Sequence, residues 1–299
     1  MCENTYDAVN YLIFDDLTAT EKADLCCKEI INKILAFGSK DINPRPKYKD
    51  GTPAHTYSIN HVLQTFDLSK GEFPLLSLRN IAVKSAIGEI LWIYQDQSNS
   101  LDLLKEKYGV TWWDAWDIGD RTIGQCYGKT VKDHNIINDL IEGIKRDPDS
   151  RRHIINLWQI EDYKQSHGLK PCALFCEFNI RHEVDGDYMD GLMLLRSSDY
   201  LTAGSINQVQ YVALLTMLAK SLGYKVGKFS NMIVNCQIYD RHVNNAKIML
   251  ERESVPANPF LDLPVKDFFD YTLDDFKIVD YPREKINKKN PQLTFELGI

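Results

Sequence analysis

The sequence predicts an α+β fold in which one mixed β-sheet is flanked by helices. Helical and strand-like segments are interspersed along the 299 residues, without the regular alternation that builds a parallel α/β sheet. No internal repeat, low-complexity tract or flexible linker divides the chain, and its 44% apolar content is enough for a substantial core. We therefore expect a single domain over residues 1–299, with residues 1–20 as a possible N-terminal extension.

Helices are predicted where apolar residues recur at intervals of three and four. The clearest case is at residues 18–37, where such a stripe stops at Gly38. The segment at 207–225 is of the long, buried type, and Gly223 marks its end. Further helices are expected at 80–95, 134–146 and 241–253.

Strands are predicted where apolar and polar residues alternate, or where short apolar runs are rich in β-branched and aromatic residues. The hairpin-like sequence HEVDGDYMD, residues 182–190, separates two of them. The expected strands are 56–68, a segment within 151–160, one from Cys172 onward, 191–199, 229–240 and 274–282.

Composition and charge exclude several classes of protein. The net charge of −7 and the pI near 5.5 leave no basic surface for a nucleic-acid backbone, so no nucleic-acid partner is expected. No apolar run approaches the ~20 residues of a membrane span, and the N-terminus lacks the basic start of a signal peptide. The seven cysteines show no zinc-binding spacing, so we expect no metal, reduced thiols and a cytoplasmic location.

One cysteine stands where a thiol could reach a cavity. In KPCALFCEFNIR, residues 170–181, Cys172 follows Pro171 at the start of a predicted strand. A cytosolic cysteine can simply be a small buried apolar side chain, but a thiol at a strand end with a cation nearby would be a nucleophile. Alternation along the strand would place these residues on one face: Cys172, Leu174, Cys176, Phe178 and Ile180.

Two arginine-containing segments could provide that cation or bind a phosphate group. DSRRHI opens a strand with Arg151 and Arg152, and LLRSSDY places Arg196 beside Ser197 and Asp199. Guanidinium groups and serine hydroxyls together suit a phosphate, because they combine bidentate and neutral donors. The alternatives are a solvated strand edge for the first segment and an ordinary turn for the second.

Glu89 lies in the apolar segment GEILW of the helix predicted at 80–95. A carboxylate is costly in such surroundings unless it is hydrogen-bonded. Glu89 is therefore either a structural carboxyl with satisfied hydrogen bonds or an acid whose raised pKa suits proton transfer.

A series of short motifs runs along the chain in a distinctive order. They are DGTPAHTYSINHVL, EFPLLSLR, GEILWIYQ, VTWWDAW, YGK, DSRRHI, the PC that opens a strand, RSSD, an asparagine eight residues after that aspartate, and CQIYDRH. In this order and spacing the chain resembles the thymidylate synthase family. The resemblance runs from about residue 28 to the C-terminus, and it is strongest to the branch that carries DGTPAHT near its start.

The resemblance implies a methyltransferase that converts dUMP and 5,10-methylenetetrahydrofolate to dTMP and dihydrofolate. Cys172 would add to C6 of the uracil and so activate C5 toward the one-carbon unit of the folate. Arg196 and Ser197 would bind the 5′-phosphate, together with Arg151 and Arg152 from the neighbouring subunit. The resemblance thus also implies a homodimer in which the sheet faces of two subunits pack together.

Further roles implied by the resemblance concern the base, the protons and the folate. Asn207 would pair with N3–H and O4 of uracil, because a carboxamide offers both an acceptor and a donor, and this favours dUMP over dCMP. Glu89 would shuttle protons to the pyrimidine O4 and the folate, and Tyr127 would act through water on the C5 proton. Tyr239 would bind the ribose 3′-hydroxyl. The residues implied for the folate are Trp113, Trp116, Asp199 and Ile299.

Two positions depart from the family pattern in the nucleotide site. Gly51 stands where many members have an arginine that binds phosphate. The candidate substitutes are Lys47, Lys49 and His55. Gln237 replaces a histidine, which alters the recognition of ribose.

A third departure leaves two enzymatic hypotheses open. The segment AGSIN, residues 203–207, replaces the family's Gly-x-Pro-Phe-Asn, which packs on the folate. A shifted folate could let water rather than hydride capture the methylene intermediate, which would make the protein a deoxypyrimidine-nucleotide 5-hydroxymethylase acting on dUMP or dCMP. Trp113 and Asn207 favour the synthase. A catalytically weak nucleotide-binding or regulatory relative is the third hypothesis, and it leaves Cys172, Glu89 and Tyr127 unexplained.

Overall fold

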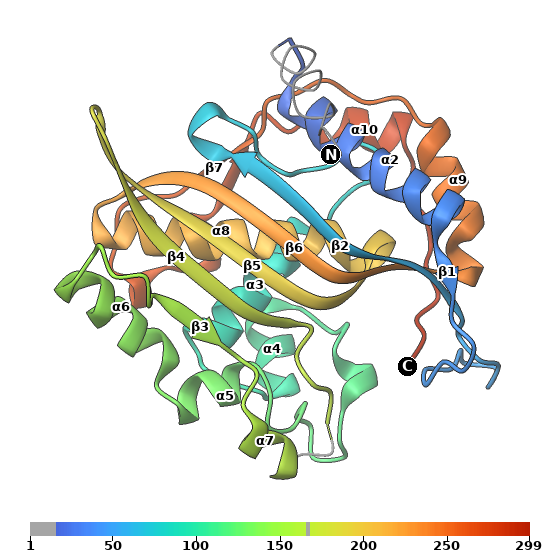
Figure 1. Ribbon diagram of the computed structural model, residues 1–299, viewed down its shortest axis with the longest axis horizontal. Coiled ribbons are helices and arrows are strands. Elements are labelled where there is room, and N and C mark those ends of the chain that lie inside the picture. Colours follow the sequence, from blue (N-terminus) through green and yellow to red (C-terminus); the bar gives the residue numbers. More distant parts are fainter. Residues whose placement is uncertain (1–15, 166–167) are drawn as a thin grey trace, which may run out of the picture.

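A six-stranded sheet forms the centre of the structure, a computed structural model that describes residues 16–165 and 168–299 (Figure 1). The strand order is β1-β2-β6-β5-β4-β3. The strands are β1 (Ser39–Lys40), β2 (Thr56–Asp67), β3 (Ile154–Asn156), β4 (Ala173–Glu183), β5 (Gly186–Asp199) and β6 (Lys225–Tyr239). A separate small sheet pairs β7 (Phe260–Asp262) with β8 (Lys277–Val279).

One parallel pair makes the central sheet mixed, as predicted. β5 and β6 run parallel because the chain crosses between them through α8 (Ser205–Leu222), whereas the other neighbours are antiparallel. α8 is buried over most of its length. It ends at Gly223, whose φ of +82° lets its N–H reach the carbonyls of Ala219 and Lys220.

The long helices are those that the sequence predicts. α3 (Val83–Tyr94) packs against α8 (Figure 1). α2 (Ala19–Phe37), α6 (Ile136–Arg146) and α9 (Val243–Glu251) are also present. Four helices of six to eight residues were not predicted, because so few turns carry little periodicity. They are α4 (Leu101–Tyr108), α5 (Gly128–Asp133), α7 (Ile160–Gln165) and α10 (Arg283–Lys289).

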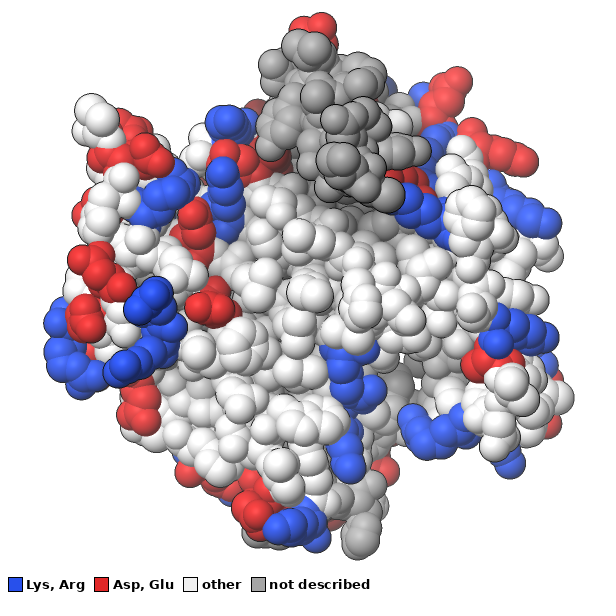
Figure 2. Space-filling view, in the orientation of Figure 1, with Lys and Arg blue, Asp and Glu red and all other residues white. Residues whose placement is uncertain are grey.

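The two faces of the central sheet differ in what covers them. Phe66, Met193 and Phe229 share one face of the sheet and are buried, and Gly191 of that face packs against Leu215 of α8. On the opposite face Leu63 is 63% exposed. The half-buried apolar residues of that face include Leu192, Leu194, Met232 and Val234. Figure 2 shows few charged side chains over the centre of this face. An exposed apolar area of this kind typically marks an interface.

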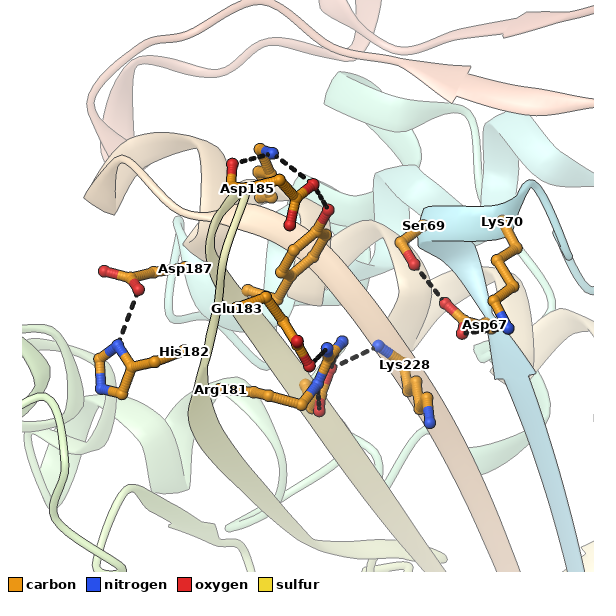
Figure 3. Close-up of polar contacts among 12 residues, drawn as sticks. Asp67, Ser69, Lys70, Arg181, His182, Glu183, Asp185, Asp187 and Lys228 are labelled. Carbon is orange, nitrogen blue, oxygen red and sulfur yellow. Dashed lines mark hydrogen bonds and ion pairs between the residues drawn. The ribbon is translucent and has the colours of Figure 1, made fainter.

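The β4–β5 hairpin carries a cluster of charges at the end of β4 opposite to Cys172 (Figure 3). Arg181 pairs with Glu183 at 2.7 Å, and His182 Nδ1 lies 2.7 Å from an Asp187 oxygen. Exposed pairs of this kind contribute little free energy each. We therefore interpret this cluster as structural: its ion pairs hold the tip of the β4–β5 hairpin in place.

The start of β4 differs from the prediction. β4 begins at Ala173, so Cys172 immediately precedes the strand, and a β-bulge follows at once. The buried residues at this end are Ala173, Cys176 and Phe178. The predicted face that Cys172 shares with Cys176 and Phe178 is therefore wrong, because the extra residue of a bulge inverts the alternation.

Three further predictions concern the N-terminus, membrane spans and metal sites. The N-terminal extension expected at residues 1–20 lies mostly outside the described residues. Within residues 16–165 and 168–299, no helix combines the length and apolar character needed to cross a bilayer. In the same ranges, no three His, Cys, Asp or Glu side chains gather as metal ligands.

Candidate active site

The peptide that carries Cys172 is held from two sides. The Cys172 N–H donates to the Tyr127 hydroxyl at 3.0 Å. On the other side, Arg196 donates to the Pro171 carbonyl at 2.9 Å and to the Lys170 carbonyl at 3.0 Å. The Arg196 N–H also donates to the Cys172 carbonyl at 2.9 Å. The Cys172 side chain is half-buried, so its thiol is accessible. The guanidinium of Arg196 places a positive charge beside the same peptide.

Tyr127 occupies strained backbone at the start of α5. Its φ of +48° is uncommon for a bulky residue, and such strain often occurs at functional sites. The following Gly128 lies so close to Ser98 that an added Cβ would be 2.1 Å from the Ser98 carbonyl oxygen. This junction fixes Tyr127, which is buried, beside Cys172. Burial, and then the neighbouring Cys172, raise the pKa of Tyr127 well above its ordinary value.

Glu89 is buried on α3, and an indole binds its carboxylate. Trp112 Nε1 donates to Glu89 Oε2 at 2.5 Å. Burial raises the pKa of Glu89, while Trp113, Trp112 and Gln210 lower it in part. Only Trp112 of these three has a hydrogen bond to Glu89 in the described residues. The side-chain nitrogens of Trp113 and Gln210 are buried there without a hydrogen-bond partner. We therefore regard Trp112 as the principal hydrogen-bond donor to Glu89.

Asn207 reaches the same region from the first turns of α8. Its Nδ2 donates to Gln210 Oε1 at 2.9 Å, and Gln210 in turn lies beside Glu89. Residues three apart on a helix share a face, which explains why one helix presents both amides. The sequence analysis missed Gln210, although its spacing from Asn207 was a usable signal. It also missed Trp112, although the WW pair was noted.

The two tryptophans predicted for the folate pack against this group. The Trp113 and Trp116 rings lie 5.4 Å apart at 62°. The Trp113 ring also lies 5.5 Å from the Tyr127 ring. Edge-to-face packing of this kind holds aromatic rings in fixed orientations. Trp113 therefore packs against both Trp116 and Tyr127.

Asp199 and Tyr239 lie at the ends of the two parallel strands. Asp199 ends β5 opposite Gln237 of β6, and Tyr239 ends β6. Ser197 lies two residues before Asp199, half-buried and next in sequence to Arg196. Burial, followed by the Asp199 carboxylate, raises the pKa of Tyr239 to about 12.

Arg45 is an exposed basic residue whose charge acts on Tyr239, and sequence reasoning did not single it out. Its positive charge opposes the rise in the Tyr239 pKa, and Cys172 also contributes to that pKa. Of the three substitutes considered for the missing arginine, His55 is paired with Asp41 through a 2.6 Å contact. No sequence signal distinguished Arg45, because its position depends on the path of the loop before β2.

The C-terminal residue docks on the same loop. The Ile299 N–H donates to the Lys47 carbonyl at 3.0 Å, and the Lys47 N–H donates to the Ile299 carbonyl at 2.8 Å. The C-terminus accordingly lies beside the segment that follows β1 (Figure 1). An added Cβ at Gly298 would be 2.7 Å from Ala54 and 2.8 Å from the Tyr239 ring, so the last residues pass close to the site.

Arg151 and Arg152 are not brought to Cys172 within one chain. Both are exposed in the turn before β3. Arg152 lines a cavity of about 530 Å³ between α6 and β3, together with His153 and Asn156. No contact between these arginines and Cys172 is present in the described part of this single chain.

The family pattern of thymidylate synthase matches residues 27–291. The chain belongs to the thymidylate synthase family. It is 48% identical over 281 residues to the thymidylate synthase of Lactococcus lactis subsp. cremoris, and the match covers 93% of this chain and 99% of that protein. It is 49% identical over 282 residues to the thymidylate synthase of Streptococcus sanguinis, with the same coverage.

A solved structure agrees with this assignment to the thymidylate synthases. The thermostable thymidylate synthase A from Bacillus subtilis superposes with a TM-score of 0.83 at 34% identity, and the match covers 93% of this chain and 99% of that one. The resemblance inferred from the motifs is confirmed, and the matches favour the synthase over the hydroxymethylase. Of the altered residues 203–207, the first two end a π-helical turn, Tyr200–Gly204, and the last three begin α8.

Proposed function

We propose that the chain performs the reaction of its family, in which dUMP and 5,10-methylenetetrahydrofolate yield dTMP and dihydrofolate. The observation that carries this proposal is the convergence of a thiol, two proton-transfer groups and a base-reading amide through shared contacts. Cys172 and Tyr127 are joined by a hydrogen bond, and Glu89 and Asn207 both lie beside Gln210. These groups come from four separate elements of the fold.

Cys172 acts as the nucleophile toward C6 of the uracil. The thiolate adds to C6, and the electron pair of the C5–C6 double bond moves toward O4 and C5. Arg196 places a positive charge next to this peptide, and Tyr127 fixes its N–H. When bound, the folate supplies the methylene carbon and then the hydride. Removal of the C5 proton releases the folate nitrogen from the new methylene group, and Cys172 leaves when hydride transfer to that group restores the C5–C6 double bond.

The nucleotide is held through its base, ribose and phosphate. Asn207 reads N3–H and O4, since its carboxamide matches the acceptor and donor pattern of uracil. Arg196 and Ser197 bind the phosphate, and Arg45 takes the place of the arginine that Gly51 replaces. The ribose lies near the end of β6. Tyr239 and Gln237 contact it there.

Proton transfer is assigned to the two buried acids. Burial raises the pKa of Glu89, which suits a carboxyl that accepts and releases protons at O4 and the folate. Tyr127 directs a water toward the C5 proton, because its hydroxyl already lies at the Cys172 peptide. Trp113, Trp116, Asp199 and Ile299 form the folate side of the pocket.

We propose that the active form is a homodimer. The outward face of the sheet is apolar, and Leu63 is 63% exposed on it, which supports burial against a second copy. Arg151 and Arg152 are exposed and do not contact Cys172 within residues 16–165 and 168–299, which supports their donation to the phosphate site of the partner. Each subunit would then complete the site of the other.

The test is a product analysis with dUMP and 5,10-methylenetetrahydrofolate. Dihydrofolate is followed by absorbance, and the nucleotide is identified by mass. We expect dihydrofolate and dTMP in equal amounts. A hydroxymethyl nucleotide without dihydrofolate would establish the hydroxymethylase instead, and tight dUMP binding without turnover would establish a non-catalytic relative. Cys172→Ser is the matched inactive control, with dUMP affinity expected within about tenfold of the unaltered chain.

A further inference from the structure

His242 is a buried histidine of the CQIYDRH motif that has no role in the proposed reaction. It is 1% exposed and lies just before α9. Its Nε2 is 2.8 Å from the Glu296 carbonyl oxygen, so it binds the C-terminal segment. Its ring packs edge-on against Tyr239 at 5.5 Å and Phe295 at 5.2 Å. The ring is therefore fixed between the end of β6 and the C-terminus.

The other ring nitrogen of His242 faces Asp199. Nδ1 lies 3.9 Å from Asp199 Oδ1. Both atoms are buried, and neither has a hydrogen-bond partner in the described residues. Buried polar atoms without partners are costly, and two such atoms facing each other need to approach by only about 1 Å to form a hydrogen bond. The second Asp199 oxygen accepts a hydrogen bond from the Thr202 hydroxyl.

The residue before His242 holds the same C-terminal position. Arg241 donates to the Glu296 carboxylate at 2.8 Å, while its other terminal nitrogen donates to Asp50 at 2.7 Å. Two consecutive residues therefore bind Glu296: Arg241 contacts the Glu296 carboxylate, and His242 contacts the Glu296 backbone carbonyl. Movement of the C-terminal segment is consequently transmitted to the His242 ring.

We propose that His242 is a positioning residue, which orients the Asp199 carboxylate for the folate when the C-terminal segment is docked. This inference rests on the proposed function, because it assigns a task to the folate side of the same pocket. Asp199 would hold the pterin ring of the folate, and His242 would link that carboxylate to Glu296.

The charge around His242 suits two hydrogen bonds at once. Burial lowers the pKa of His242, but Asp199, the Glu296 carbonyl and Asp240 together raise it above its ordinary value. The protonated ring carries an N–H at both nitrogens, so one can donate to Glu296 and the other to Asp199. A neutral ring could donate to only one of them.

The experiment compares substitutions that remove one nitrogen at a time. His242→Gln keeps a donor near the Nε2 position and loses the one that faces Asp199, whereas His242→Asn does the reverse. Asn245→Ala is the matched control, because it removes a 2.7 Å bond to the Thr294 carbonyl without touching Asp199. Each variant is measured for the KM of folate and of dUMP, for folic acid affinity in the presence of dUMP, and for hydrogen exchange of the C-terminal peptide.

We expect His242→Gln to raise the KM for folate and the dissociation constant of folic acid about tenfold, the effect of one lost hydrogen bond to a charged group. The KM for dUMP and the C-terminal exchange should stay within about twofold. Asn245→Ala should speed exchange and change folate affinity less. An unchanged folic acid affinity in His242→Gln, or an equal loss of dUMP binding, would overturn the proposal.

These measurements distinguish a failure of the proposed function from a failure of the role proposed for His242. If the unaltered chain binds folic acid with dUMP but forms no dihydrofolate, the proposed function fails, while the affinity data still decide the role of His242. If His242→Gln does not fold, His242→Asn is compared with His242→Ala, which lacks both donors. Folic acid affinity at least about threefold tighter in His242→Asn than in His242→Ala would support the inference, and equal affinity would contradict it.

Discussion

The Trp112 indole donates a hydrogen bond to the Glu89 carboxylate at 2.5 Å. This contact joins α3 to the loop that carries Trp113 and Trp116, and it acts against the effect of burial on the Glu89 pKa. The carboxyl group is thereby held in the apolar helix without losing its ability to ionise. The ionisation of Glu89 thus depends on a residue whose role was not evident from the motif.

Trp112→Phe should raise the pKa of Glu89, because the indole N–H stabilises the ionised form. The pH dependence of kcat/KM for dUMP reports this ionisation, and Glu89→Gln identifies which limb belongs to Glu89. The midpoint of that limb should move to higher pH. Trp113→Phe is the control and should move it less, since the Trp113 nitrogen forms no hydrogen bond in the described residues. An equal shift in both variants would contradict the assigned donor.

Glu89→Gln should lower kcat by about 10²–10⁴-fold and make the protein more stable at high pH. The pKa of Glu89 is raised in the folded state, so the folded protein binds the proton more tightly than the unfolded chain. The stability of the unaltered protein therefore falls as pH rises through that pKa, whereas the amide does not ionise. We expect the Tm difference to grow on the order of a few degrees between pH 5 and pH 8. A pH-independent difference would refute this origin.

Arg45→Gln should raise the KM for dUMP about tenfold, because the phosphate loses a charge-assisted partner. Lys49→Gln is the control from the same loop and should change the KM less than threefold. Deoxyuridine, which lacks the phosphate, should bind both variants equally. If Arg45→Gln weakens deoxyuridine as much as dUMP, the arginine does not act through the phosphate.

Asn207→Asp should shift the preference from dUMP toward dCMP. A protonated aspartate or its carboxylate can accept from the cytosine amino group, whereas the asparagine amide matches uracil. The ratio of kcat/KM for the two nucleotides is the measurement, and Asn207→Ala controls for a general loss of binding. Unchanged selectivity would mean that this side chain does not read the base.

The periodicity of apolar residues predicted the long helices and strands. It failed for short helices and for features that depend on a neighbouring strand. α8 and β2 carry enough residues for a clear pattern, whereas the six residues of α5 do not. The bulge after Ala173 could not be foreseen, because register is set against the neighbouring strand β5.

The site shows the same division. Cys172, Glu89 and Asn207 stand in recognisable motifs, so the sequence alone singled them out. Arg45 and Trp112 became evident only from the path of loops, since each acts on a residue far away in the chain. No alternation or spacing rule describes a loop of that kind.

The most direct test of the account is the mass of the complex formed with 5-fluoro-dUMP and 5,10-methylenetetrahydrofolate. The fluorine cannot leave as a proton does, so the adduct at C6 should persist. We expect the intact chain to gain the mass of both ligands, and peptide mapping to place the bond on Cys172. A chain of unaltered mass, or a modification on another cysteine, would contradict the central claim that this sulfur attacks the pyrimidine.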